Sequence, residues 1–233
     1  CRFGNNILDI GFPDGMEHYK LTIYSFINKI IELLDTLKVM TENALIDSGF
    51  IILRAFMELS AQLFYMINDG NTIKQKALTY QFYEMCKKYD RKKLIDELKS
   101  DVLFSEIIQL FSEGKDYKKW YSFYDKNIKT IRQLFEKNEW QSLYENFYVP
   151  LCEDVHVSHC MLDILYESRL DKYCFKPYRL FDNHILLLHS VLVTILPVYE
   201  KLALSYGNDS LINEWKKYRE RTEEYLNLND DFA

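Results

Sequence analysis

Hydrophobic residues recur every three or four positions along most of the chain, which is the spacing of one face of an α-helix. The positions that follow Pro13 and Asp14 predict a first long helix that ends near Thr41. Residues 43–68 predict a second helix, which ends at an Asn-Asp-Gly-Asn sequence because these residues accept the left-handed backbone that closes helices. Two long helices joined so closely are expected to be antiparallel neighbours.

Shorter periodic segments predict helices at residues 72–89, 90–98, 101–111, 127–135, 139–148, 150–168, 180–206 and 209–226. Residues 115–126 lack a clean period and predict a loop packed by its own aromatic rings. Only 7 Gly and 4 Pro occur, so the turn signals of a β-sandwich or barrel are missing. The pattern predicts an all-α, multi-helix bundle built on two long antiparallel helices. A single domain over residues 1–226 is expected, followed by an acidic C-terminal tail at 227–233.

Composition restricts the location and partners of the chain. The most apolar run, residues 185–198, is shorter than the roughly 20 residues that span a bilayer, so a buried core helix and no membrane partner are expected. Five Cys without a CxxC pair predict reduced thiols and, with no signal peptide visible, a cytoplasmic protein. A net charge of −6 argues against nonspecific coating of nucleic acid but leaves a local basic patch open.

The second predicted helix carries a narrow polar stripe within an otherwise apolar sequence. Arg54 and Glu58 lie one turn apart in its middle, and Asn43, Asp47, Gln62 and Tyr65 share their side. Three interpretations are open. The pair could face water as an ordinary i,i+4 ion pair, it could lock two helices together, or Arg54 could hold a phosphate or carboxylate in a polar cleft.

A second group of polar residues lies in residues 150–168. Cys152, His156, His159 and Asp163 fall on one side of the predicted helix. His156 is a candidate for proton transfer, and the spacing of Glu153 and His156 also occurs in di-iron helix bundles. Those centres need a second Glu-x-x-His motif, which this chain lacks, so neither a metal nor another cofactor is assigned. Structural histidines or a partly exposed polar face are the alternative.

The predicted loop at 115–126 alternates lysines with aromatic residues. Such a mixture can follow a nucleic-acid backbone and stack on its bases, and it can equally be a solvated loop anchored by aromatic rings. The candidate nucleic-acid-binding residues are Lys115, Lys118, Lys119, Trp120 and Tyr121.

Three segments, taken in order, resemble an uncharacterised family of all-helical bacterial proteins related to the HEPN superfamily. They are Ile52 to Glu58, the pair Trp120-Tyr121, and Tyr144 with residues 148–158, together within about residues 48–161. The resemblance implies a HEPN-like fold that is either a metal-independent ribonuclease, in a toxin or phage-defence setting, or an inert dimerising module. HEPN ribonucleases place a His four to six residues after the Arg, and no His follows Arg54 at that spacing.

Two functions are therefore expected as alternatives. In an enzyme, Arg54 would stabilise a phosphate, His156 would be general acid or base, and Glu58 would orient one of them, so that RNA is cleaved through its own 2′-hydroxyl. This requires Arg54 and His156 to share a cleft bordered by residues 115–126. In a non-catalytic interaction module such as a homodimer, Arg54 and Glu58 would be paired, with little accessible surface and no pocket around them. A metal-binding bundle is a third alternative, and no protein partner can be named.

Overall fold

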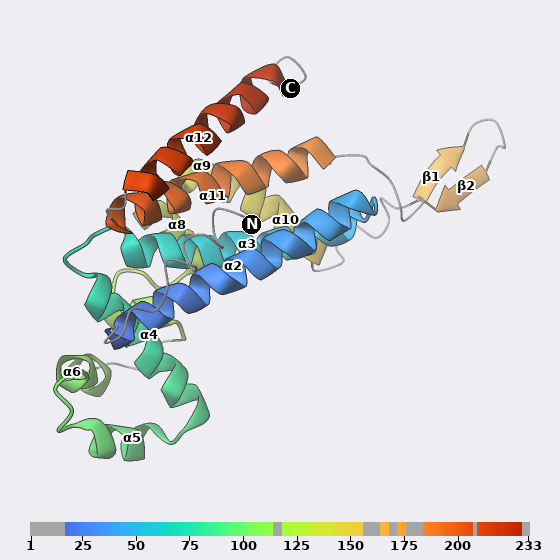
Figure 1. The fold of residues 1–233 in the computed structure, drawn as a ribbon. Helices are drawn as coiled ribbons and strands as arrows, with labels where there is room; N and C mark the ends of the chain where they lie inside the picture. The colour runs from blue at the N-terminus through green and yellow to red at the C-terminus, as the bar shows by residue number, and fades with distance from the viewer. Residues whose placement is uncertain are drawn as a thin grey trace.

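The computed structural model describes residues 17–113, 118–155, 164–167, 172–175, 184–206 and 209–229 (Figure 1). Their long helices are α2 (His18–Glu42), α3 (Ile46–Ile67), α4 (Ile73–Lys88), α11 (His184–Tyr206) and α12 (Asp209–Asn229). The shorter ones are α5 (Arg91–Leu98), α6 (Ser105–Glu113), α7 (Trp120–Tyr124), α8 (Ile131–Lys137), α9 (Gln141–Leu143), the π-helical turn η1 (Tyr144–Tyr148) and α10 (Val149–Val155). The predicted all-α, multi-helix fold is confirmed, and α12 includes the first three residues of the predicted tail.

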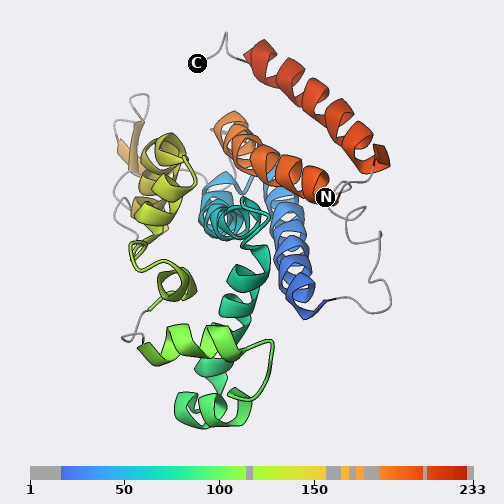
Figure 2. The ribbon, with the colours of Figure 1, turned by 90° about the vertical axis from the view of Figure 1, so that its left-hand side faces the viewer.

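Helix α3 occupies the centre of the fold. It contacts α2 and α11 on one side and α8 and α10 on the other, and Figure 2 shows it between these two groups. Helix α12 packs on α11, while α4 leads from the end of α3 to α5 and α6. Residues 118–155, which contain α7 to α10 and η1, are called the second layer below.

Helices α2 and α3 form the predicted antiparallel pair, joined by a tight turn. The turn holds Ala44 at a φ of 56°, where a residue without a side chain is favoured. The amide of Leu45 donates to the carbonyl of Met40 at 2.8 Å, which closes the end of α2. Further along α3, Gly49 lies so close to α11 that an added Cβ would be 2.7 Å from Leu187 Cδ1. Glycine therefore allows α11 to approach the central helix.

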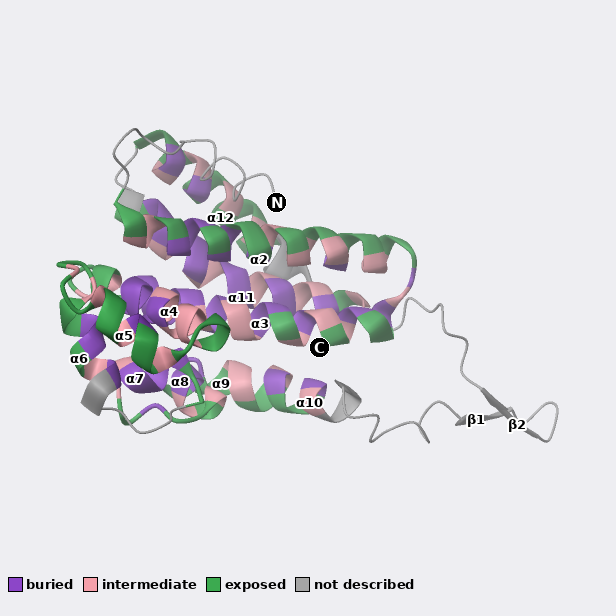
Figure 3. Ribbon diagram, turned by 90° about the horizontal axis from the view of Figure 1, so that it is seen from below, coloured by how far each residue is buried: buried purple, intermediate pink, exposed green. Residues whose placement is uncertain are grey.

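Buried residues form two hydrophobic clusters, and Figure 3 shows the burial along the helices. The main core surrounds α3. A smaller core joins the end of α4 to α5, α6 and α7, and its centre is the stacked pair Phe111 and Phe123, with ring centroids 3.9 Å apart. This second cluster gives the α4–α7 end of the molecule its own packing.

The helix predicted over residues 150–168 is wrong in its second half. Strand β1 (Ile164–Glu167) lies there and pairs antiparallel with β2 (Lys172–Phe175) in a two-stranded hairpin. Ile164 is paired with Phe175, and Tyr166 with Tyr173. β-branched and aromatic residues favour strands, so local propensity and a cross-strand partner outweigh the apolar spacing read as helical.

The loop predicted at residues 115–126 is also wrong at residues 120–124. Trp120 to Tyr124 form α7, and its first four residues are buried. The ring centroid of Trp120 lies 5.9 Å from that of Tyr65 on α3 and 5.8 Å from that of Tyr80 on α4. Distant helices therefore bury these rings, which the local sequence could not indicate.

Helices α3 and α11 are each long and apolar enough to cross a membrane by length and composition alone. Core helices of soluble proteins meet the same criterion. Within the 18-residue apolar stretch of each helix, 61% of the residues of α3 and 44% of those of α11 are buried in the fold. Length and composition are therefore weak evidence for a membrane span.

Candidate functional site

The polar stripe of α3 meets the second layer. Arg54, Glu58 and Gln62 follow one another at intervals of one helical turn, so their side chains lie along one side of the helix. Tyr148 contacts the first two, and Trp120 contacts the third. The stripe therefore forms hydrogen bonds with residues that lie between 58 and 94 positions away in the sequence.

Tyr148 connects the two charges. Its hydroxyl donates to Glu58 Oε1 at 2.5 Å and accepts from Arg54 Nε and Nη2, each at 3.4 Å. Arg54 Nε is also 3.4 Å from Glu58 Oε1, which completes an i,i+4 ion pair. One hydroxyl thus serves both ions, and these three residues are called the Tyr148 network below.

The backbone before Pro150 places Tyr148 at this position. Pro150 has no N–H, so it cannot donate the helical hydrogen bond to the carbonyl four residues earlier. The turn before it widens into η1, where the amide of Val149 donates to Tyr144, five residues earlier. The rings of Tyr144 and Tyr148 stack with centroids 5.3 Å apart, and the Arg54 guanidinium lies 5.6 Å from the Tyr148 ring centre. Such π-helical turns are frequent at functional sites.

Burial and hydrogen bonding set the protonation of the network. Burial raises the pKa of Tyr148 far above its usual value of 10, and the hydrogen bond to Glu58 raises it further, so the phenol is a neutral donor. The hydrogen bond with Tyr148 raises the pKa of Arg54. The side chains of Arg54 and Glu58 are 25% and 30% exposed. The pair is therefore an ion pair at the edge of a helix contact, which combines the first two expected interpretations.

Gln62 continues the same contact. Its Oε1 accepts from Trp120 Nε1 at 2.7 Å, and its Nε2 donates to the carbonyl of Glu58 at 3.4 Å. Nearby, Asn138 Nδ2 donates to the carbonyl of Ala61 at 2.8 Å. The second layer therefore meets α3 through directed hydrogen bonds from three separate elements.

The proposed nucleic-acid-binding residues separate into two groups. Trp120 and Tyr121 are 2% and 1% exposed, so their rings offer no surface for stacking on bases. This part of the expectation is corrected, because both rings fill the contact between α7, α3 and α4. Lys118 and Lys119 are exposed, and Lys115 lies outside the described residues.

His156 lies outside the described residues, as do His159 and Asp163. A meeting of His156 with Arg54 stays a prediction. Within the described part of the chain, no group of three or more His, Cys, Asp or Glu is placed to hold a metal ion. The residue that sequence reasoning missed is Tyr148, although its position two residues before a helical proline could have indicated an unusual turn.

A family model, described as a family of unknown function (DUF5677), matches residues 20–171, which is more than half of the chain. The chain belongs to DUF5677. Neither the curated proteins nor the solved structures contain a match. The DUF5677 region includes the whole Tyr148 network and Trp120, whereas α11 and α12 lie beyond it.

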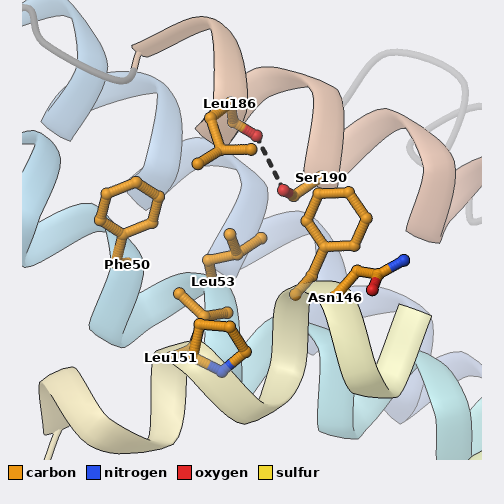
Figure 4. Close-up of a pocket in the computed structure, with 8 residues that line it drawn as sticks. Phe50, Leu53, Asn146, Leu151, Leu186 and Ser190 are labelled. Atoms are coloured by element: carbon orange, nitrogen blue, oxygen red, sulfur yellow. Dashed lines mark hydrogen bonds between the residues drawn. The ribbon is translucent and has the colours of Figure 1, made fainter. Parts of the chain in front are cut away.

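Next to the network, the DUF5677 region and α11 line a pocket of about 200 Å³ (Figure 4). Most of its lining is apolar, and Ser190 Oγ donates to the carbonyl of Leu186 rather than to the pocket. The lining residues are Phe50, Leu53, Asn146, Phe147, Pro150, Leu151, Leu186 and Ser190. None of the three network side chains lines it, so the charges of Arg54 and Glu58 are not directed into this space.

Proposed function

We propose that this DUF5677 protein is a non-catalytic helical binding module in which the Tyr148 network is structural. The observation that carries the proposal is the 2.5 Å hydrogen bond from Tyr148 to Glu58, made by the same hydroxyl that accepts from Arg54. A catalytic arginine needs donors aimed at the position where charge develops on the substrate. Here two guanidinium nitrogens are directed at a tyrosine of the same chain.

The energetics support a structural role. A hydrogen bond to a charged group stabilises a fold by about 1.5–3 kcal/mol, whereas an exposed ion pair contributes about 0–1 kcal/mol. Removing Arg54 would leave Glu58 with Tyr148 alone in a partly buried position. Arg132 offers a matched comparison, since it forms an i,i+4 pair with Glu136 at 2.9 Å and its side chain is 57% exposed.

The test combines nuclease assays with thermal unfolding of the full chain. Labelled RNA and DNA are incubated with the parent, Arg54→Ala and Arg132→Ala, with and without EDTA. The proposal predicts no cleavage by any of the three and a melting temperature several degrees lower for Arg54→Ala than for Arg132→Ala. EDTA-resistant RNA cleavage by the parent that disappears in Arg54→Ala would contradict it.

A metal-independent ribonuclease is the second candidate. Arg54 would stabilise a phosphate, His156 would transfer a proton, and Glu58 would orient one of them. The HEPN resemblance implies the metal-independent reaction class. Its support is the partial exposure of Arg54 and Glu58, which leaves the guanidinium reachable by an anion. In this case the parent cleaves RNA in EDTA, and His156→Ala abolishes cleavage without lowering the melting temperature. A cytoplasmic toxin or phage-defence setting belongs to this proposal. A homodimer belongs to the non-catalytic module instead, and light scattering of the full chain tests it.

A further inference from the structure

Exposed lysines lie on α4 and on two segments that contact it, α5 and the start of α7. Lys87 and Lys88 end α4, Lys92 lies in α5, and Lys118 and Lys119 directly precede α7. All five are exposed. They are called the lysine face below, and two of its segments lie some 30 positions apart in the sequence.

Tyr83 connects these segments. Its hydroxyl donates to the carbonyl of Lys118 at 2.5 Å, while Lys87 Nζ lies 4.5 Å from the centre of its ring. Arg91 fixes α5 in turn, because its guanidinium donates to the carbonyl of Phe111 and lies 5.5 Å from the Phe123 ring centre. The small core of α4–α7 therefore fixes the backbone segments that carry these lysines.

The lysine face is electrostatically unbalanced. Lys87 pairs with Glu84 at 2.6 Å, but the other four lysines form no ion pair with any described residue. Residues 73–126 carry 12 Lys and Arg against 9 Asp and Glu, whereas the whole chain carries 29 against 35. A positively charged segment in an acidic protein attracts a polyanion locally while the rest of the surface repels it.

We propose that the lysine face binds the phosphate backbone of a single-stranded nucleic acid. Lysine ammonium groups neutralise phosphates without reading sequence, and an aromatic ring beside them can stack on a base. Tyr89 supplies such a ring, since it directly follows Lys88 and is 65% exposed. Tyr89 would stack on a base, which is the role that the sequence predicted for Trp120 and Tyr121, both of which are buried.

This inference names the partner that the proposed binding module would bind. It rests on the proposed function in one respect only, that binding requires no catalysis. The Tyr148 network contributes nothing to the lysine face. A failure of nucleic-acid binding would therefore leave the Arg54 unfolding result intact, and cleavage by the parent would leave the binding measurement intact.

The test is fluorescence anisotropy with a labelled 20-nucleotide single-stranded RNA, and DNA of the same sequence, at 50 and 200 mM salt in EDTA. The face variant is the triple charge reversal Lys88→Glu, Lys118→Glu and Lys119→Glu. The matched control reverses Lys38, Lys216 and Lys217, which are exposed on α2 and α12, and changes the net charge equally. Circular dichroism checks that both variants fold.

The expected result is a Kd raised at least about tenfold by the face variant and less than about threefold by the control, with a shallower salt dependence for the face variant. Tyr89→Ala should raise the Kd several-fold without changing the salt dependence. Three results would overturn the proposal: equal weakening by both triple variants, no binding by the parent at 50 mM salt, or lysine-dependent binding to phosphatidylserine vesicles with none to RNA or DNA.

Discussion

The two sides of α3 are built from different chemistry. Toward α2 and α11 the helix is apolar, and Gly49 allows Leu187 of α11 to approach closely. Toward the second layer it presents Arg54, Glu58 and Gln62, each bonded to a side chain from residues 120–148. One helix therefore uses close packing on one side and directed polar contacts on the other.

The two sides of α3 contribute differently to the stability of the fold and to the alignment of the packed helices. Apolar burial contributes roughly 25 cal/mol per Å² and is non-directional, so it holds helices together without fixing their alignment. A hydrogen bond adds only about 0.5–1.5 kcal/mol, but it is lost when partners slip by one turn. We infer that the apolar side supplies most of the folding free energy, while the polar side fixes where the second layer lies.

Alkaline pH should destabilise the polar side of α3. Of the changes considered, it should lower the free energy of unfolding the most. Burial raises the pKa of Tyr80 and of Tyr121 to about 12, and also raises those of Tyr65 and Tyr148. Tyr121 lies in α7, Tyr65 and Tyr80 pack against Trp120 of the same helix, and Tyr148 ends η1. Stability from a raised pKa is complete below the unfolded value of about 10 and is lost as pH rises toward the folded value.

By pH 11, ionisation of each of these four tyrosines then lowers the free energy of unfolding by about 1 kcal/mol. Together they lower it by an amount on the order of 4 kcal/mol. Burial lowers the pKa of Lys76, which acts in the opposite direction as pH rises toward 10.5. Urea unfolding between pH 8 and 11 measures the net change, and tyrosinate absorbance reports when the phenols ionise. A free energy of unfolding that stays constant to pH 11 would show that these phenols are not buried as described.

Truncating the apolar side should cost nearly as much. Phe56 is fully buried and lies seven residues, two turns, from Gly49 on the side of α2 and α11. Phe56→Ala should lower the free energy of unfolding by about 3–5 kcal/mol because it leaves a cavity. Ile51→Ala is the control, since Ile51 is on the same helix and is 49% exposed. Similar losses for both variants in urea unfolding would rule out the assigned burial.

Two buried tyrosines give a matched pair on the polar side. Tyr148 donates to Glu58, whereas the hydroxyl of Tyr121 has no hydrogen-bond partner among the described atoms. Tyr148→Phe should therefore lower the free energy of unfolding by about 1–2 kcal/mol. Tyr121→Phe should be neutral or stabilise by up to about 1 kcal/mol, because it removes an unsatisfied buried group. Equal effects in urea unfolding would argue that the Tyr148 network makes no specific contribution.

The turn that joins α2 to α3 provides the smallest expected effect. Ala44 has a φ of 56°, which costs a residue with a Cβ about 1 kcal/mol. Ala44→Gly should raise the free energy of unfolding by about 0.5 kcal/mol, because the freedom gained by the unfolded chain offsets part of the relief. Ala55→Gly, at an exposed position within α3, should lower it by about 1 kcal/mol. Destabilisation by both variants would show that the turn is not strained.

Much of the helical layout could be predicted from the sequence. Helices α2, α3 and α4 fall within a few residues of the predicted segments, and Asp90 and Thr130 cap α5 and α8 as their residue types favour. Periodic spacing and capping are local signals, so they can be read without tertiary contacts. The stripe containing Arg54, Glu58 and Gln62 was visible for the same reason.

The partners of that stripe could not be predicted. Tyr148 is 90 residues from Glu58, and Trp120 is 58 residues from Gln62, so no local pattern joins them. The buried α7 depends on Tyr65 and Tyr80 from other helices, and β1 depends on pairing with β2. Each failure concerns a segment whose conformation is decided by a distant partner.

Hydrogen exchange on Tyr148→Phe tests most directly whether the polar side of α3 fixes the second layer. The amides of residues 131–155 should exchange at least about tenfold faster than in the parent, since about 1.4 kcal/mol of local stability corresponds to a factor of ten. The amides of α2 and α11 should keep their rates, and Tyr121→Phe should accelerate exchange in neither group. Uniform acceleration across α2, α11 and the second layer, or no acceleration at all, would contradict the division of α3 into a stabilising side and an aligning side.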